Sequence, residues 1–310
     1  MKIFIELPTW LGDSVMASPA IENLVNFFSD TEITLMGSVV SIEALMNNPK
    51  VTKTYVLEKN YFNLYKTINQ LGEFDLFVSF RDSFRSKFTK FFVSAQKKYQ
   101  FNKKIYYEGH QVEKFNNFIN NSLEINNIAS RLILHTEKLA KDRKNKLLGI
   151  NPGASYGSAK RWYPKDFADV ASSLSSHYDI IIFGGPEEKD IAADIEKSLI
   201  EKGVNNYQNL AATMNISELI LQITNLDLFI TGDSGPMHIA AASQIPTVAI
   251  FGPTNDKETS QWKNNKSIII KKNLECQPCM QRMCPLNHNN CMKLITASDV
   301  LDAASSLTKL

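Results

Sequence analysis

The sequence contains few of the features that mark membrane, secreted or nucleic-acid-binding proteins. No apolar run approaches the roughly 18 residues needed to cross a bilayer, and Glu6 and Pro8 interrupt the apolar start before a signal-peptide core could form. Basic and acidic residues nearly balance, with a net charge of +2 over 310 residues, so general nucleic-acid binding is not indicated. We therefore expect a cytoplasmic globular protein with no nucleic-acid partner.

Cysteine is scarce, and all of it lies in one short segment, CQPCMQRMCPLNHNNC. Such clustering in a cytoplasmic chain favours metal or redox chemistry over a disulfide framework. The intervals between the cysteines do not match the paired knuckles of common zinc sites, so two interpretations stay open: a structural metal site, or reduced and partly buried thiols. The residues concerned are Cys276, Cys279, Cys284 and Cys291.

Two nucleotide-related motifs are also missing. No Gly-x-Gly-x-x-Gly sequence follows a predicted strand, which argues against an NAD(P)-dependent oxidoreductase, because those glycines bring the backbone close to a pyrophosphate. The chain has no Asp-x-Asp motif that could hold Mg²⁺ against a nucleotide sugar. A transfer reaction from such a donor is therefore expected to need no metal and no other cofactor.

What the chain does contain is an alternation of apolar strands and amphipathic helices from end to end. In the first half we expect helices at residues 14–28, 40–47 and 61–71. The strands expected there are residues 2–7, 33–36, 55–57 and 75–79.

A polar, charged stretch at residues 138–146 separates this half from a second one. There the expected helices begin at Pro164 and near Glu187, and the expected strands are residues 147–151, 179–183, 226–230 and 247–251. Alternating strands and helices imply parallel sheets with helices on both faces. The predicted fold class is α/β, with two Rossmann-like, doubly wound domains, residues 1–145 and 146–310, and a cleft between them.

Glycine-bearing loops follow several of the predicted strands, and each precedes a helix. Ligands of open parallel sheets bind beyond the carboxyl ends of the strands, and the free N–H groups and dipole of a helix start favour an anion such as phosphate. A single loop of this kind often marks only the start of a helix. Its occurrence after several strands indicates a ligand-binding site at the carboxyl edge of the sheet. The loops are residues 8–13, 152–160, 184–188 and 232–235.

Two of these loops carry charged residues of particular interest. Lys160, with Arg161 beside it, ends loop 152–160, and a lysine together with helix N–H groups can stabilise the charge that grows on a diphosphate leaving group. Asp13 ends loop 8–13. It is either the N-cap of the following helix or a general base for an acceptor hydroxyl.

The sequence GDSG at residues 232–235 looks like the nucleophile loop of trypsin-like serine proteases. The alternation of strands and helices does not fit the all-β barrel to which that loop belongs, and the histidines of the chain do not readily complete a triad. Two interpretations remain. Asp233 or Ser234 caps the helix that starts near Pro236, or Ser234, the backbone amides and His238 bind phosphate.

Residues 83–107 contain seven basic residues and no acidic one, interleaved with phenylalanine and tyrosine. Such a run is either a solvent-exposed face without a binding role or a surface that binds an anionic membrane or substrate.

Taken in order, several segments resemble the successive signatures of glycosyltransferase family 9, the bacterial ADP-heptose:lipopolysaccharide heptosyltransferases. They are LPTWLGDSVMASPAIENL, NPGASYGSAKRWYP, NLAATMNISELI and GDSGPMHIAAASQIPTVAIFGPT. The resemblance covers nearly the whole chain. The cysteine segment is similar to the tail of many members called heptosyltransferase II and favours that subgroup.

The resemblance implies a GT-B fold, with an acceptor-binding first domain and a donor-binding second domain. Asp13 matches the general base of the family and Lys160 its phosphate-binding lysine, so both are implied to be catalytic. The implied acceptor-side residues are Gly12, Arg85 and Lys87.

For the donor, the resemblance places Met214 beside the adenine and Glu188 near the ribose, with the adjacent Glu187 leaving the register open. The 233–238 loop would surround the phosphates and the sugar. The implied donor-binding residues are Gly153, Ala154, Lys160, Glu188, Met214, Asp233, Ser234, Gly235 and His238.

The implied reaction moves heptose, with inversion, from ADP-heptose to the first heptose of an anionic lipid A–Kdo–heptose acceptor at the cytoplasmic face of the inner membrane. Alternatives are a heptosyltransferase I or III, another GT-B sugar transferase, or a nucleotide-binding module without catalysis.

Overall fold

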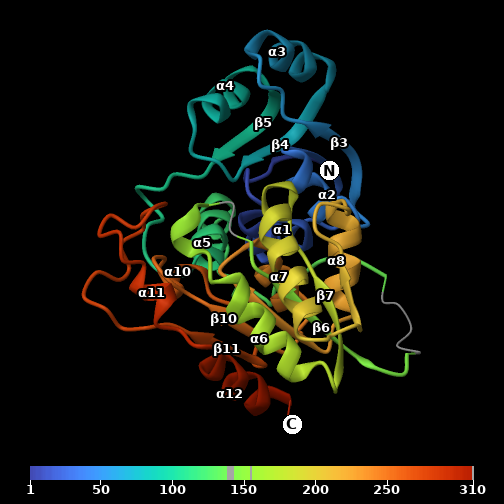
Figure 1. Ribbon diagram of the computed structural model, residues 1–310. Coiled ribbons are helices and arrows are strands. Elements are labelled where there is room, and N and C mark those ends of the chain that lie inside the picture. The colour runs from blue at the N-terminus through green and yellow to red at the C-terminus, as the bar shows by residue number, and fades with distance from the viewer. Residues whose placement is uncertain (138–142, 154–155, 309–310) are drawn as a thin grey trace. The chain divides into compact units, whose positions relative to one another are not determined.

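The computed structural model describes residues 1–137, 143–153 and 156–308, and it divides into two compact units, Met1–Thr136 and Glu137–Leu310 (Figure 1). Ala154 therefore lies outside the described residues. The division falls upstream of the boundary predicted near residue 145. The reason is visible in the segment before it, where the Ile133 amide donates to Ser18 Oγ at 2.8 Å and His135 Nε2 lies 3.3 Å from Glu22 Oε1.

The first unit is built on a parallel sheet with the strand order β3-β2-β1-β4-β5. The strands are β1 (Lys2–Glu6), β2 (Glu32–Gly37), β3 (Val51–Val56), β4 (Glu73–Ser79) and β5 (Ser94–Gln100). The helices are α1 (Leu11–Phe27), α2 (Val39–Leu45), α3 (Tyr61–Gln70), α4 (Phe84–Phe92) and α5 (Gln111–Leu123).

The second unit is built on a parallel sheet with the order β11-β10-β9-β6-β7-β8. The strands are β6 (Lys146–Asn151), β7 (Tyr178–Ile182), β8 (Tyr207–Asn209), β9 (Leu228–Gly232), β10 (Thr247–Ile250) and β11 (Ser267–Ile270). The helices are α6 (Pro164–Leu174), α7 (Lys189–Glu201), α8 (Ile216–Thr224), α9 (Gly235–Ala242), α10 (Asp256–Thr259), α11 (Asn290–Lys293) and α12 (Ala297–Thr308), with 3₁₀ turns at Ser158–Lys160 and Pro186–Glu188.

The predicted α/β class with two doubly wound parallel sheets is confirmed. In both sheets the central strands are largely buried, and most of their buried side chains are apolar, as expected for strands covered on both faces. Phe4 and Phe77 lie in the core of the first unit, and Trp162 and Phe167 in that of the second. Among the described residues, no helix combines the length and apolar character that a bilayer span requires.

The start of α1 corrects the sequence prediction. The helix begins at Leu11 rather than Ser14, because the Ser14 amide donates to Trp10 O at 3.0 Å and Ser14 Oγ, which is buried, also donates to that carbonyl. Trp10 occupies the N-cap position. Asp13 therefore lies inside the first turn, and its interpretation as the N-cap is wrong.

Each sheet has one point where the strand order reverses. In the first unit β1 lies between β2 and β4, and in the second β6 lies between β7 and β9. The loops that follow such a pair run in opposite directions and leave a crevice at the carboxyl edge, where α/β proteins bind their ligands. Asp13, in the first turn of α1, and Arg81 follow β1 and β4, whereas Lys160, in a 3₁₀ turn, and Asp233 follow β6 and β9.

Candidate functional site

At the reversal point of the second unit, the structure brings Lys160 and Asp233 together. Lys160 Nζ lies 2.6 Å from Asp233 Oδ2, and their side chains are only 10% and 7% exposed. Lys160 comes from the 3₁₀ turn after β6, and Asp233 directly follows β9. The ion pair thus fixes an ammonium group at the carboxyl edge of the sheet, close to the start of α9.

Asp233 does not act as a helix cap. Its Oδ2 also accepts a hydrogen bond from Thr254 Oγ1 at 2.6 Å, and Ser234 is the residue in the N-cap position of α9. Ser234 Oγ makes no capping bond there. The interpretation of Asp233 or Ser234 as a side-chain cap is therefore wrong.

Ser234 Oγ instead takes part in a polar cluster beneath the loop. Asn151 Nδ2 donates to Ser234 Oγ at 3.1 Å and to Thr231 Oγ1 at 3.2 Å, and the two hydroxyl oxygens lie 3.2 Å apart. Gly235 begins α9, and His238 is buried within it. These contacts hold the loop after β9 against the end of β6.

Glu188 joins two further strand-end loops. Its side chain is buried, and its Oε2 accepts a hydrogen bond from the Gly185 amide at 2.6 Å. A Cβ atom on Gly153 would lie 2.7 Å from Glu188 Cγ, so a side chain at position 153 would collide with this carboxylate arm. Glu187 is exposed. The structure therefore separates the two glutamates, and Glu188 is the one that faces the loops.

Met214 lies apart from this group in the chain, in the loop between β8 and α8, and is partly buried. Gly153 and Lys160 both come close to Gly232, whose missing Cβ would lie 3.7 Å from each of their carbonyl oxygens. The sequence-predicted residues that the structure gathers at one edge are thus Gly153, Lys160, Glu188, Asp233 and Ser234.

The cysteine segment supports the Lys160 turn, a role that the sequence did not reveal. Tyr156 Oη donates to Met280 O at 2.6 Å, and the Ala159 amide donates to Arg282 O at 3.1 Å. The Lys160 ammonium lies 5.1 Å from the centroid of the Tyr156 ring, and the Arg282 guanidinium lies 5.4 Å from it. The nearest signal in the sequence was the closeness of tyrosine and lysine in YGSAK.

The four cysteines are free thiols, with Cys291 buried and the others partly exposed. In the part of the chain that the structure describes, no histidine, cysteine and carboxylate side chains are grouped as a metal site requires. Burial raises the pKa of Cys291, and the neighbouring thiols raise it further. By contrast, hydrogen bonding from the backbone, first of all from Asn289, lowers the pKa of Cys284.

In the first unit, Gly12 and Asp13 lie in the first turn of α1, both partly exposed. Arg85 and Lys87 lie on α4, and Lys87 is exposed. The Arg85 guanidinium donates to Lys59 O at 3.1 Å and lies 5.5 Å from the centroid of the Tyr61 ring. Arg85 thereby links α4 to the start of α3.

Two doubly wound units, one with a lysine and a helix start at its reversal point and the other with a carboxylate, are consistent with the class of GT-B sugar-nucleotide transferases. Residues 64–289 match the model of glycosyltransferase family 9 (heptosyltransferase). The chain belongs to this family, and it is a glycosyltransferase.

Relatives and solved structures agree with this assignment. The chain is 41% identical to the lipooligosaccharide heptosyltransferase 2 of Campylobacter jejuni, with 100% of this chain and 99% of the relative covered. It superimposes with a TM-score of 0.83 on the E. coli ADP-heptose lipopolysaccharide heptosyltransferase II, at 20% identity and 100% and 99% coverage. An E. coli heptosyltransferase solved with ADP gives a TM-score of 0.77 at 13% identity, with 99% and 100% covered. These similarities confirm the GT-B fold.

Proposed function

We propose that the chain is a heptosyltransferase II, which moves heptose from ADP-heptose to the first heptose of the lipooligosaccharide or lipopolysaccharide inner core. The 41% identity to a lipooligosaccharide heptosyltransferase 2 over the full chain supports the subgroup. The observation that carries the donor side is the Lys160–Asp233 pair at the reversal point, because it holds a cation where a diphosphate would bind.

In the proposed reaction, Asp13 takes the proton from a heptose hydroxyl of the acceptor. The oxygen then attacks the anomeric carbon of the donor from the face opposite ADP, and the bond between that carbon and the diphosphate oxygen breaks. The electron pair leaves with ADP, whose charge Lys160 and the backbone amides of Ser234 and Gly235 stabilise. No metal takes part in the proposed reaction.

The position of Asp13 imposes a requirement on this mechanism. A carboxylate in the first turn of a helix is stabilised by the helix dipole, which lowers its basicity. A general base works best when its pKa lies near the working pH. The acceptor must therefore desolvate Asp13 when it binds, because burial of a carboxylate raises its pKa.

We also propose that the enzyme works at the cytoplasmic face of the inner membrane, where its anionic lipid-linked acceptor is found. The first unit carries a suitable surface on α3 and α4, which pack together beside the sheet (Figure 1). We call it the aromatic-basic face. Its most exposed aromatic side chains are Phe62, Phe84 and Phe91, at 63%, 77% and 76% exposure. The basic residues among them are Lys66, Arg85, Lys87 and Lys90.

The test of the function is incubation with ADP-heptose and defined acceptors that carry zero, one or two heptoses, followed by mass spectrometry. We expect one heptose to be added to the acceptor that already carries one. Addition to the acceptor without heptose would instead indicate a heptosyltransferase I. Addition only to the acceptor that carries two heptoses would indicate a heptosyltransferase III. Binding of ADP without transfer to any acceptor would make the chain a nucleotide-binding module.

A further inference from the structure

The reversal point of the first unit contains a buried carboxylate that the proposed reaction does not use. Glu6 ends β1, directly beside Ser79 at the end of β4, and it is fully buried. Its Oε2 accepts a hydrogen bond from Ser79 Oγ at 2.7 Å, and its Oε1 accepts one from Ser86 Oγ at 3.3 Å. A buried charge of this kind needs a partner.

That partner is Arg81, whose Nη1 lies 3.7 Å from Glu6 Oε1. The distance is long for a hydrogen bond, which requires about 2.7–3.2 Å for N–H···O. The Arg81 guanidinium makes no hydrogen bond to any other residue in the described part of the chain, although its side chain is only 14% exposed. Glu6 therefore holds Arg81 in place by charge and leaves its N–H donors available.

A second guanidinium lies close to the same carboxylate. Arg85 donates one hydrogen bond, from Nη2 to Lys59 O, whereas its Nε is buried and has no acceptor among the described residues. Glu6 acts electrostatically on both arginines, and each arginine lowers the pKa of that carboxyl against the effect of burial. One carboxylate thus faces two guanidinium groups, and one positive charge is left over.

The acidic residue next to Arg81 in the chain has another partner. Asp82 follows Arg81 in the chain, but its Oδ2 accepts a hydrogen bond from the Lys103 amide at 3.1 Å. Burial and the charge of Arg85 lower the pKa of Arg81, and the charge of Glu6 opposes them. The excess of N–H donors and of positive charge therefore persists at this edge of the sheet.

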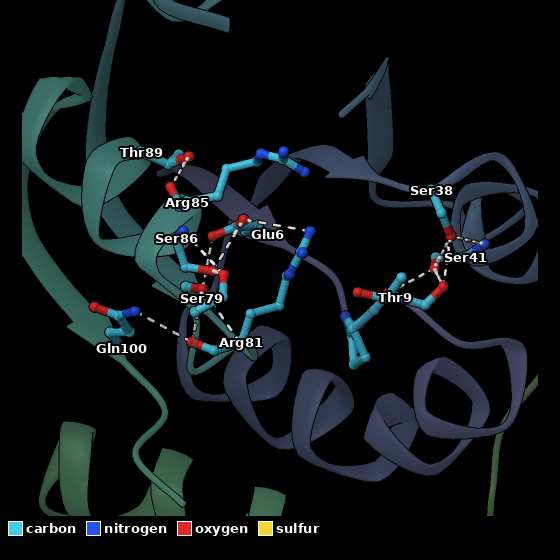
Figure 2. A network of polar contacts seen from close by, with 12 residues as sticks. Glu6, Thr9, Ser38, Ser41, Ser79, Arg81, Arg85, Ser86, Thr89 and Gln100 are labelled. Atoms are coloured by element: carbon cyan, nitrogen blue, oxygen red, sulfur yellow. Dashed lines mark hydrogen bonds and ion pairs between the residues drawn. The ribbon is translucent and has the colours of Figure 1, made fainter. Parts of the chain in front are cut away.

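Figure 2 shows where the donors point. The guanidinium groups of Arg81 and Arg85 both extend past the Glu6 carboxylate on the side of the loop that contains Thr9. That loop is held from its other side by α2, because Ser38 Oγ donates to Thr9 O at 2.8 Å and Ser41 Oγ donates to Pro8 O at 2.6 Å. The same loop leads into the α1 turn that carries Asp13.

We infer that Arg81 and Arg85 form an oxyanion subsite at the reversal point of the first unit, with Glu6 as the buried group that positions Arg81. Its ligand is a carboxylate or phosphate group on an acidic sugar next to the heptose that is attacked. Planar guanidinium groups suit both of these anions, because their N–H donors match two oxygens at once. The identity of the ligand as part of the acceptor rests on the proposed function, whereas the subsite itself does not.

The kinetic test combines a variant of the protein with a variant of the acceptor. Wild-type enzyme, Arg81→Gln and Arg131→Gln are assayed on acceptors that have or lack the carboxylates, and that have or lack the phosphates, of the inner core. Arg131→Gln is the matched control, because it removes an exposed arginine of the same unit. We expect removal of the recognised group to raise the acceptor KM of the wild type and of the control roughly tenfold to a hundredfold, and to change the KM of Arg81→Gln little.

A purely structural role would lower the activity of Arg81→Gln equally on all acceptors, and that result would overturn the inference. Arg81→Lys keeps the charge without the planar fork, so it should fold and show an intermediate KM. If Arg81→Gln does not fold, the comparison is made with Arg81→Lys, and a KM response equal to that of the wild type counts against the subsite.

A binding test separates this inference from the proposed function. The protein is saturated with ADP, so that the donor phosphates are occupied, and saturation-transfer NMR is recorded with mannose 6-phosphate, glucuronate and uncharged mannose. A signal for either acid that exceeds that of mannose, persists in Arg131→Gln and is lost in Arg81→Gln supports the subsite even if no heptose is transferred. The acid that gives the signal identifies the recognised group. Equal signals in the wild type and Arg81→Gln, or no signal for either acid, would sink the inference.

Discussion

At the scale of single residues, the two reversal points have related designs. In each, a carboxylate at or just after one strand of the reversal pair meets a cation that follows the other strand: Asp233 with Lys160, and Glu6 with Arg81. The carboxylate is the more buried partner in both pairs. The basic group is therefore positioned by its own protein, and binding of an anionic ligand needs less ordering of the side chain.

Replacement of Asp13 tests the proposed base. We expect Asp13→Ala to lower kcat by about 10² to 10⁴, the usual contribution of a positioned base, and to leave the affinity for ADP nearly unchanged. Turnover measured by ADP release and calorimetry with ADP give the two quantities. An unchanged kcat would remove Asp13 from the mechanism.

Replacement of Lys160 should affect both function and stability. Lys160→Ala should weaken donor binding and slow turnover, because the diphosphate loses its cation. It should also reduce the free energy of unfolding by roughly 3–5 kcal/mol, since Asp233 is left as an uncompensated buried charge. Urea denaturation measures the second effect.

The double variant Lys160→Met with Asp233→Asn separates these two roles. It removes both charges, and the amide oxygen introduced at position 233 can still accept the hydrogen bond from Thr254. We expect most of the lost stability to return while turnover stays low. Recovery of turnover together with stability would show that Lys160 contributes only to the fold.

Glu6 should make stability depend on pH in an unusual direction. Burial raises the pKa of this carboxyl, and the hydrogen bond from Ser79 and the charge of Arg81 only partly oppose the effect. The folded protein then keeps a proton over a pH range in which the unfolded chain has released it, so this group lowers stability as pH rises through that range. Glu6→Gln cannot ionise. Its stability relative to the wild type should therefore increase from acid pH towards neutrality, as urea denaturation at a series of pH values would measure; the opposite trend would contradict the raised pKa.

At the scale of elements, the segment after β11 supports two strand-end loops of the second unit. It reaches the Lys160 turn through Met280 and Arg282, and it reaches the loop after β10 because Gln277 Nε2 donates to Gly252 O at 2.7 Å. The same segment contains the cysteines. The cysteine thiols therefore belong to the segment that supports the Lys160 turn of the proposed donor site.

The thiols of this segment should differ in reactivity. Hydrogen bonding from the backbone at Asn289 favours the Cys284 thiolate, whereas burial disfavours ionisation of Cys291. Because the thiolate is the nucleophile, iodoacetamide should label Cys284 well before Cys291, as peptide mass spectrometry would detect. Labelling in urea serves as the control, where the two rates should converge. Protection of all four thiols in the native protein would instead point to a bound metal.

One of the elements that the sequence analysis missed shows a clear physical cause. β5 is an edge strand with several exposed polar residues, including Lys97, so its apolar periodicity is weak and its lysines look like part of a basic run. The buried strands near the middle of each sheet were predicted well, because apolar residues on both faces give an unambiguous run. The start of α1 was misplaced because Asp13 and Ser14 resemble a capping pair, whereas the helix starts without any side-chain cap.

The residues of the candidate site likewise include some that the sequence predicted and one that it did not. Lys160, Asp233 and Glu188 were predictable, since they occupy strand-end loops in the printed sequence. Arg81 was not, because the significance of its guanidinium depends on Glu6, which is far away in the sequence and joins it only through the pairing of β1 with β4. The support of the Lys160 turn by Met280 and Arg282 is a tertiary contact of the same kind.

At the scale of the whole molecule, the net charge is small, but basic residues are concentrated in one region. The aromatic-basic face on α3 and α4 combines exposed rings with basic residues, the composition that binds at the surface of an anionic bilayer. Some of its cations lie over its rings, such as Lys66 over Phe62 at 4.5 Å. Aromatic insertion and charge attraction would therefore act at the same place.

Vesicle binding tests this face. We expect the protein to bind phosphatidylglycerol vesicles more tightly than phosphatidylcholine vesicles, and added salt to weaken the binding. Phe91→Ser should reduce it, while Ile200→Ser, which removes a side chain that is 59% exposed on α7, should not. Cosedimentation measures both. Binding that is insensitive to salt, or that responds equally to the two substitutions, would contradict the proposed surface.

The contact of Glu188 with Gly153 and Gly185 has a consequence for how this enzyme can vary. A Cβ at either glycine would run into the Glu188 side chain, at 2.7 Å from its Cγ for Gly153 and 2.8 Å from its Oε2 for Gly185. The conflict is more severe at Gly153, where the Cβ would meet the inner part of the Glu188 side chain, than at Gly185, where it would meet only the carboxylate end. A methyl group gained at position 153 is therefore expected to require a shorter acid at position 188, which would in turn lose the hydrogen bond from the Gly185 amide. Positions 153 and 188 should therefore vary together in functional homologues and in engineered libraries, and a single exchange at position 153 should be rare.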